Sequence, residues 1–242
     1  MSSRRMVAVL PAYNEAAAIG SLVDEIRAYD PDLDVVVVDD ASTDETAAFA
    51  EAHGAIVLRL PFNVGIGGAV QTGFRYARDH GYDVAVRLDG DGQHDPRELP
   101  KLLAPLERGE ADLVIGSRFA DPGGTYKPPL SRRIGIRVFA RLVSLLGGQR
   151  VTDTTSGFVA LDRVGIELFA RQFPHDYPEV EATLVALRSG LRLAQVQVDM
   201  RERASGSSSI TFVRSLYYLV KVTLALLVAS LRRYPRLEGV PR

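Results

Sequence analysis

The sequence predicts an α/β fold, a doubly wound and mostly parallel sheet with helices on both faces. Short apolar runs rich in Val and Ile alternate with stretches of helical composition through the first half of the chain. Such runs are typical of strands buried on both faces, and their alternation with helices favours parallel strands joined by right-handed crossovers. We therefore expect strands at residues 6–10, 34–38, 55–60, 83–88 and 112–115, and helices at residues 16–29, 44–53, 67–80 and 96–108.

The pattern changes after Arg118. Pro and Gly at residues 121–129 predict a loop, and Gly and Ser at residues 203–209 predict a flexible segment. Between them we expect a basic helix at 132–146, a strand at 155–161, a helix at 179–189 and a strand at 191–198. We divide the chain into one α/β domain, residues 1–209, and a C-terminal apolar helix with a basic tail, residues 210–242.

Composition limits the chemistry. The 242 residues suffice for one such domain with a sizeable core. There is no cysteine, which excludes disulfides, thiolate metal sites and cysteine nucleophiles. No two of the four histidines have the spacing of a zinc pair. Any bound metal should therefore have mainly oxygen ligands, which favours Mg²⁺ or Mn²⁺.

Charge is distributed unevenly. Residues 1–117 contain ten Lys and Arg against twenty Asp and Glu, whereas residues 118–242 contain nineteen against ten. An acidic half before a basic half suits a metal–carboxylate site that faces a site for an anionic partner, although uneven surface charge also arises by chance. Residues 1–15 lack the apolar region of a secretion signal, so we expect a cytoplasmic protein.

The strongest chemical signal is the stretch LDGDGQH at residues 88–94. Asp89 and Asp91 follow a predicted buried strand, and open α/β sheets bind ligands at the edge where such strands end. A divalent cation on these carboxylates could also bind two phosphate oxygens and neutralise a diphosphate leaving group. Read alone, the stretch could equally be a polar turn, because Asp-Gly turns are common.

Two other predicted strands end in polar clusters, PAYNE at residues 11–15 and DDASTD at residues 39–44. Glu15 and Asp44 could be first-turn acids favoured by the helix dipole. Core packing, however, does not require such clusters at three strand ends. The glycine-rich residues 63–69 follow the third strand and lack the Gly-x-Gly-x-x-Gly pattern, which argues against a dinucleotide-binding fold.

Taken in order, these motifs resemble those of family 2 glycosyltransferases of GT-A fold, in particular the branch of dolichol-phosphate mannose synthase and its bacterial polyprenyl-phosphate relatives. The resemblance covers about residues 5–210 and includes RLDGDGQHDP at 87–96, GSRF at 116–119 and DTTSGFVAL at 153–161. It implies an inverting, metal-dependent enzyme that moves a sugar from a nucleotide-diphosphate sugar to a polyprenyl phosphate. Residues 1–117 would then bind the donor and residues 118–209 the acceptor.

The resemblance also implies roles for single residues. The donor base and ribose would be bound by Pro11, Tyr13, Glu15 and Asp40. The donor diphosphate would be bound through a metal on Asp89, Asp91 and Gln93, with Asp91 catalytic.

On the acceptor side, the resemblance implies that Arg118, Arg132 and Arg133 clamp the acceptor phosphate. Arginine suits this role because its planar fork makes two bonds to phosphate oxygens, although Arg132 and Arg133 could equally be solvated helix surface. Arg201 resembles the residue of a mobile loop that closes over the donor diphosphate.

An alternative acceptor is a sugar hydroxyl of a cell-surface polysaccharide or glycolipid. A hydroxyl needs a base, which an anionic phosphate does not. Glu181 is the candidate base, whereas Glu179 is more simply a first-turn acid. Two further classes are nucleotidyl transfer, disfavoured because no basic glycine-rich signature follows the first strand, and a catalytically inactive binding module, disfavoured by the intact Asp89 and Asp91.

The apolar residues 210–231 raise the question of a membrane. Lys221 divides them and Arg232, Arg233 and Arg236 follow. The uncharged part is shorter than the roughly 20 residues that span a bilayer. This helix could therefore lie in the membrane interface, cross the membrane imperfectly, or pack against the core or a second subunit. We expect an enzyme at the inner face of the cell membrane, with a homodimer or a small membrane-protein partner left open and no nucleic acid bound.

Overall fold

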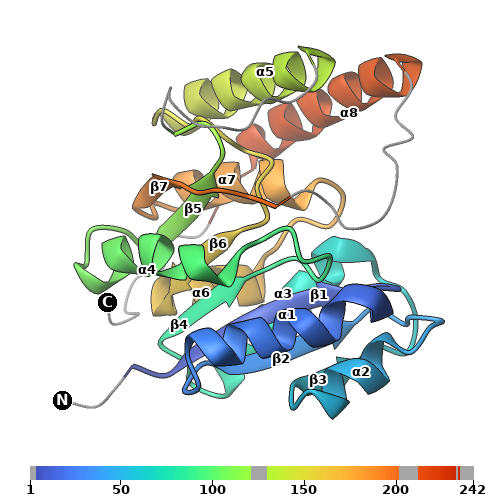
Figure 1. The fold of residues 1–242 in the computed structure, drawn as a ribbon. Helices are drawn as coiled ribbons and strands as arrows, with labels where there is room; N and C mark the ends of the chain where they lie inside the picture. The colour runs from blue at the N-terminus through green and yellow to red at the C-terminus, as the bar shows by residue number, and fades with distance from the viewer. Residues whose placement is uncertain (1–3, 121–129, 202–211, 233, 235–242) are drawn as a thin grey trace.

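A computed structural model describes residues 4–120, 130–201, 212–232 and 234, with the backbone alone at 130–134 and 212–219. The chain forms a seven-stranded sheet between layers of helices (Figure 1). The strands are β1 (Met6–Ala12), β2 (Asp34–Asp39), β3 (Ile56–Arg59), β4 (Val84–Arg87), β5 (Leu113–Ser117), β6 (Val159–Asp162) and β7 (Leu193–Gln197). The expected loop at 121–129 and the expected flexible segment at 203–209 lie outside the described residues.

The strand order is β3-β2-β1-β4-β6-β5-β7. Strands β1 to β4 pair in parallel and β7 pairs in parallel with β5, whereas β6 is antiparallel to both of its neighbours. The predicted mostly parallel sheet is confirmed. Because β6 is reversed, its beginning lies at the sheet edge where β1, β2 and β4 end.

Side chains of the central strands alternate between two apolar clusters. Val7 and Val9 of β1 face one cluster and Ala8 and Leu10 face the other, and all four are fully buried. Strand β3 differs from the expectation of burial on both faces, because it lies at the edge of the sheet and leaves Ile56 39% exposed.

Helices cover both faces, as predicted. The cluster around Ala8 includes residues of α1 (Ala16–Tyr29), α2 (Thr46–Ala52) and α4 (Leu99–Glu107), the last preceded by the short 3-10 helix η1 (Pro96–Glu98). The cluster around Val7 includes residues of α3 (Gly65–Asp79) and α6 (Arg163–Arg171).

Two local details differ from expectation. Helix α2 begins at Thr46 rather than at residue 44, because the Asp44 carboxylate accepts hydrogen bonds from the backbone N–H groups of Thr46 and Ala16. Helix α6 was not expected from the sequence. It begins after Asp162, whose side chain accepts a hydrogen bond from the Gly165 N–H at 2.9 Å.

A further group of helices packs beyond β5, at the top of Figure 1. It consists of α5 (Leu130–Gly147), α7 (Pro178–Arg188) and α8 (Phe212–Leu231), and α8 contacts both of the others. Val222, Leu226 and Ala229 of α8 are buried in the core. The opposite side of α8 leaves apolar residues exposed, namely Val220, Leu224, Leu227, Val228 and Leu231. Within the described residues no helix combines the length and the apolarity needed to cross a membrane.

Candidate active site

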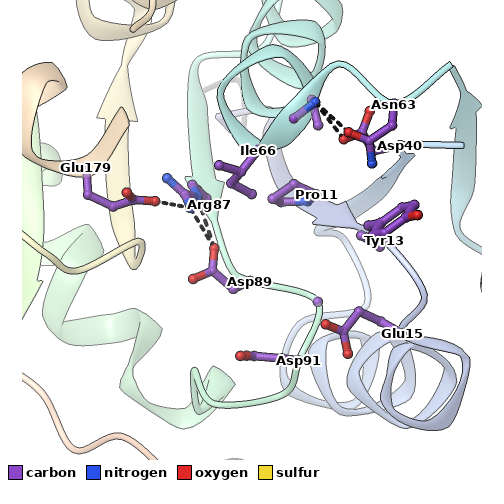
Figure 2. A pocket seen from close by; sticks show the side chains of 14 residues that line it. Pro11, Tyr13, Glu15, Asp40, Asn63, Ile66, Arg87, Asp89, Asp91 and Glu179 are labelled. Atoms are coloured by element: carbon purple, nitrogen blue, oxygen red, sulfur yellow. Dashed lines mark hydrogen bonds and ion pairs between the residues drawn. The ribbon is translucent and has the colours of Figure 1, made fainter. Parts of the chain in front are cut away.

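A cavity of about 350 Å³ lies at the edge of the sheet where β1, β2 and β4 end (Figure 2). The strand ends supply Pro11 and Ala12 at the end of β1, Asp40 after β2, and Arg87 at the end of β4. Its other lining residues are Tyr13, Glu15, Asn63, Gly65, Ile66, Ala69, Asp89, Gly90, Asp91 and Glu179. The cavity therefore brings together all the residues expected to bind the donor except Gln93.

The Asp40 carboxylate anchors the glycine-rich segment that leads into α3. It is buried, and it accepts hydrogen bonds from the N–H groups of Val64 at 2.7 Å and Gly65 at 2.9 Å. Gly65 has a φ of +79°, a conformation that side-chain-bearing residues rarely adopt. Asp40 thus shapes one wall of the cavity through the backbone of residues 64 and 65.

Two loops are tied together beside that wall. Asn14 has a φ of +56°, and its side-chain oxygen accepts a hydrogen bond from the Thr43 N–H at 2.8 Å. The Glu15 N–H donates to the Thr46 hydroxyl at 2.8 Å. These bonds connect the ends of β1 and β2, and they place Glu15 and the half-exposed Tyr13 at the cavity.

Arg87 is the centre of the charge arrangement in the cavity. Its guanidinium is buried, and Nη2 donates to Oδ1 of Asp89 at 2.8 Å and to Oε1 of Glu179 at 2.9 Å. Burial alone would lower the pKa of Arg87, but the charges of Asp89 and Glu179 raise it overall. Arg87 is thus a fixed cation that holds a carboxylate of the loop after β4 and a carboxylate of α7 side by side.

His94 holds the backbone of the acidic loop, residues 88–95. Its ring stacks on Phe158 with centroids 4.9 Å apart, and Nδ1 accepts a hydrogen bond from the Asp89 N–H at 2.9 Å. Burial lowers the pKa of His94, so the imidazole is neutral and its proton lies on Nε2. The neutral imidazole of His94 therefore fixes the backbone of the loop at Asp89.

Asp89 and Asp91 fit a hard divalent cation. Both line the same cavity, and the Oδ1 atom of Asp91 accepts a hydrogen bond from the Gln93 N–H at 3.1 Å. Cations such as Mg²⁺ and Mn²⁺ prefer carboxylate and amide oxygens and keep coordination positions for water and phosphate. Among the described residues there is no cluster of three or more acidic or histidine ligands. A cation here would therefore depend on ligands from outside these two carboxylates.

Arg201 lies next to the acidic loop. Its backbone N–H donates to the Gln93 carbonyl at 2.9 Å, and its guanidinium pairs with Glu25 at 2.7 Å and Asp95 at 3.0 Å. The side chain is not among those that line the cavity. Arg201 therefore lies beside the acidic loop, and its guanidinium is paired with one carboxylate of α1 and one of the loop.

Arg118, one of the three arginines expected to clamp the acceptor phosphate, is already paired inside the fold. This side chain is buried against Asp153, with Nε 2.9 Å from Oδ2, and it also donates to the Thr155 hydroxyl at 2.6 Å. An acceptor phosphate would have to displace a buried carboxylate, so we remove Arg118 from the acceptor site. Arg132 and Arg133 belong to α5, but their side chains lie outside the described residues.

Glu179 and Glu181, the two acidic residues weighed as a base, lie differently with respect to the cavity. Glu179 lines the cavity and Glu181 does not. Residues two apart on a helix point in different directions, so only one of them can face the cavity. Glu181 lies away from the cavity, and its pKa is raised by burial and then by the charge of Asp176.

The sequence analysis gave no role to Arg87, His94 or Gly157, and it disfavoured Glu179 as a first-turn acid. Gly157, just before β6, is so close to the acidic loop that a Cβ there would lie 2.6 Å from Oδ2 of Asp89. Arg87 carried a usable signal, because a charged residue in a buried apolar strand is rare unless it is paired. The residues that contact Arg87 and Gly157 include ones distant in sequence, and no local pattern indicates those contacts.

Comparison with known proteins agrees with this geometry. The chain matches the family model described as glycosyl transferase family 2 over residues 7–169. It is 34% identical over 215 residues to undecaprenyl-phosphate mannosyltransferase of Micrococcus luteus, covering 86% of this chain and 88% of the relative. It is 32% identical over 219 residues to polyprenol monophosphomannose synthase of Mycolicibacterium smegmatis, covering 86% and 82%.

The fold is also similar to solved structures. Glucosyl-3-phosphoglycerate synthase from Mycobacterium tuberculosis, in complex with Mn²⁺, UDP-glucose and phosphoglyceric acid, superposes with a TM-score of 0.70 at 26% identity, covering 95% of this chain and 80% of that one. The expected GT-A fold and the expected branch are thereby confirmed. The chain belongs to glycosyltransferase family 2 and is a hexosyltransferase.

Proposed function

We propose that this enzyme transfers a hexose from a nucleotide-diphosphate sugar to a polyprenyl phosphate, with inversion at the anomeric carbon and with the help of Mg²⁺ or Mn²⁺. The observation that carries the proposal is the shared cavity. Asp89 and Asp91 line it together with Pro11, Tyr13 and Asp40 at the ends of the neighbouring strands. Relatives that act on undecaprenyl phosphate and polyprenol support the acceptor, because they match over most of both chains.

The donor would lie along the strand ends. Its base and ribose would contact Tyr13, Glu15 and the wall shaped by Asp40, and its diphosphate would lie at Asp89 and Asp91. A divalent cation bound by Asp89, Asp91 and Gln93 would neutralise the charge that develops on the leaving diphosphate. Arg201 would add a second positive charge to the diphosphate after leaving Glu25 and Asp95.

The transfer itself replaces one bond with another. An oxygen of the acceptor phosphate forms a bond to the anomeric carbon, while the bond from that carbon to the donor diphosphate breaks on the opposite face. No base is required, because the acceptor oxygen is already an anion. Arg132 and Arg133 remain our candidates for the acceptor phosphate.

The direct test is release of nucleotide diphosphate from a panel of nucleotide sugars, measured with Mn²⁺ in the presence and absence of a short polyprenyl phosphate. We expect release that depends on both the metal and the lipid phosphate. Release that requires a glycan hydroxyl and ignores the lipid would support the alternative, a sugar-hydroxyl acceptor. For that alternative the structure offers Glu179, because its carboxylate lies in the cavity.

We also propose that the enzyme works at the inner face of the cell membrane, bound through α8. A polyprenyl chain stays in the bilayer, so its phosphate is available only at the surface. The apolar stripe of α8 defined by Val220, Leu224, Leu227, Val228 and Leu231 is exposed, and Arg232 follows it, also exposed. An apolar face with adjacent basic groups suits the interface of an anionic membrane.

A further inference from the structure

The Glu179 carboxylate is a polar group of the cavity to which the donor base, the diphosphate and the metal give no role. It belongs to the first turn of α7, and its side chain is 25% exposed where it lines the cavity. Its Oε1 atom shares the donor Nη2 of Arg87 with Oδ1 of Asp89. Glu179 therefore lies immediately beside the carboxylate proposed to bind the metal.

The order of groups along the cavity matches the order of groups in a nucleotide sugar. Figure 2 shows Glu179 on one side of Asp89, with Tyr13 and Asp40 on the other side. A donor with its base at Tyr13 and its diphosphate at Asp89 and Asp91 must extend its sugar past Asp89. The side chains that it then meets include those of Arg87 and Glu179.

We infer that Glu179 binds hydroxyl groups of the hexose being transferred, and that Arg87 positions Glu179 for this contact. The inference rests on the proposed function. Glu179 is the specificity-determining residue, because a carboxylate accepts hydrogen bonds and cannot donate them when ionised. It should select donors whose sugar presents hydroxyl groups on that side.

Arg87 makes this contact strong and directional. Its guanidinium is 3% exposed and bonded on both sides, so it cannot follow a moving partner. It forms an ion pair with the Glu179 carboxylate at 2.9 Å, and hydrogen bonds to a carboxylate are about twice as strong as those between neutral groups. A site built to bond a hydroxyl also discriminates against an analogue that lacks it, because the carboxylate then loses that hydrogen bond.

The experiment compares a nucleotide sugar with its nucleotide. Isothermal titration with Mn²⁺ would measure binding of GDP-mannose and GDP, and of UDP-glucose and UDP, to the full-length protein and to Glu179→Gln. Gln keeps the size of the side chain and an acceptor for Arg87. We expect the Kd of the preferred nucleotide sugar to rise about 10-fold or more, with the Kd of the nucleotide unchanged.

Two further variants complete the test. Glu167→Gln removes a carboxylate that is also ion-paired with an arginine but lies outside the cavity, and it should leave both Kd values unchanged. Arg87→Lys keeps the charge but not the two-sided bonding, and it should reduce the preference for the nucleotide sugar over the nucleotide. A purely structural role for Arg87 would leave that preference intact.

The remaining outcomes are distinct. If Glu179→Gln binds both ligands like the wild type, the inference is wrong, and a loss of turnover with normal binding would identify Glu179 as a base. If both Kd values rise equally, Glu179 acts only as a structural partner of Arg87, and the inference is again wrong. If the wild type binds no nucleotide at all, the proposed function itself fails.

Discussion

Gly157 lies directly against the carboxylate of Asp89. A Cβ at residue 157 would lie 2.6 Å from Oδ2 of Asp89 and 2.9 Å from Nη2 of Arg87. Real Cβ atoms do not approach other atoms so closely, so any larger residue must push the carboxylate or the guanidinium aside. The absence of a side chain at this position is a requirement of the site itself.

The first prediction follows from that contact. Gly157→Ala should displace Asp89 and lower the turnover of nucleotide sugar about 10-fold or more, because a small misplacement of a charged group in a site is costly. Overpacking should also reduce the free energy of unfolding by about 1–3 kcal/mol. Turnover and thermal unfolding would be measured together. A variant with wild-type turnover would show that Asp89 is not needed in its observed position.

The second prediction concerns the metal. Asp91→Asn keeps the shape of the side chain but removes its charge, so it should reduce Mn²⁺-dependent turnover about 100-fold or more. The unfolding temperature without metal should be unchanged. EDTA should abolish turnover of the wild type, and excess Mn²⁺ should restore it. Turnover that persists in EDTA would contradict the metal site.

The third prediction concerns the contact between α3 and the segment before α7. A Cβ at Gly67 would lie 2.4 Å from the Pro174 carbonyl oxygen and 2.6 Å from Cα of His175. Gly67→Ala should therefore move the backbone that leads to Glu179, and raise KM for the nucleotide sugar. The control is Gly135→Ala in α5, where a Cβ meets no atom of the described residues within 4 Å. That substitution should stabilise the helix by up to about 1 kcal/mol. Equal KM values for the two variants would disprove the contact.

The fourth prediction is a pH dependence of stability. Burial, together with the charge of Asp112, raises the pKa of Asp162 to about 6. Below about pH 4 this carboxyl is protonated in both the folded and the unfolded state, so it does not lower the free energy of unfolding. As pH rises from about 4 toward about 6, the carboxyl loses its proton in the unfolded state but keeps it in the folded state. The free energy of unfolding therefore falls over this range.

Asp162→Asn removes this charge and keeps a good helix cap. The variant should therefore gain stability relative to the wild type as pH rises from about 4 to 7, by about 1 kcal/mol once the partial exposure of the group is allowed for. Urea unfolding at several pH values measures the difference. A difference that does not change with pH would contradict the raised pKa.

The fifth prediction concerns the membrane. Truncation before α8 would be a poor test, since Val222, Leu226 and Ala229 belong to the core. The combined variant Leu224→Ser, Leu227→Ser and Val228→Ser changes only exposed positions and should lose flotation with anionic liposomes while keeping its fold. Phe49→Ser with Ile56→Ser, exposed on the opposite part of the molecule, is the control. Full-length protein that never floats at low salt, or that instead dimerises through α8, would contradict membrane binding.

The parts of this fold that could be predicted from the sequence depend on local patterns. The apolar runs that form β1 and β2, and the amphipathic residues of α1, repeat with the periods of strand and helix. The acidic loop was identifiable because Asp89 and Asp91 are two residues apart. In each case the signal lies within a short window of chain.

The missed features depend on contacts between distant segments. Arg87 meets Glu179 across 92 positions of sequence, and only the packing of α7 decides that residue 179 rather than residue 181 faces the cavity. Arg118 looked available for a phosphate because its partner Asp153 is 35 positions away. Patterns of single residues cannot reveal which charges are already neutralised inside the fold.

The reversed strand β6 has a consequence for the order in which the molecule can be assembled. It pairs with β4 on one side and β5 on the other, both of which precede it in the chain. During synthesis those two strands emerge before the strand that must separate them, so direct association of β4 with β5 would be a trap. Gly157 and Phe158 reach the acidic loop only when β6 enters that gap. The nascent first half can therefore form β1 to β4 early, but the surroundings of Asp89 are completed only after β6 and then Glu179 of α7 have left the ribosome.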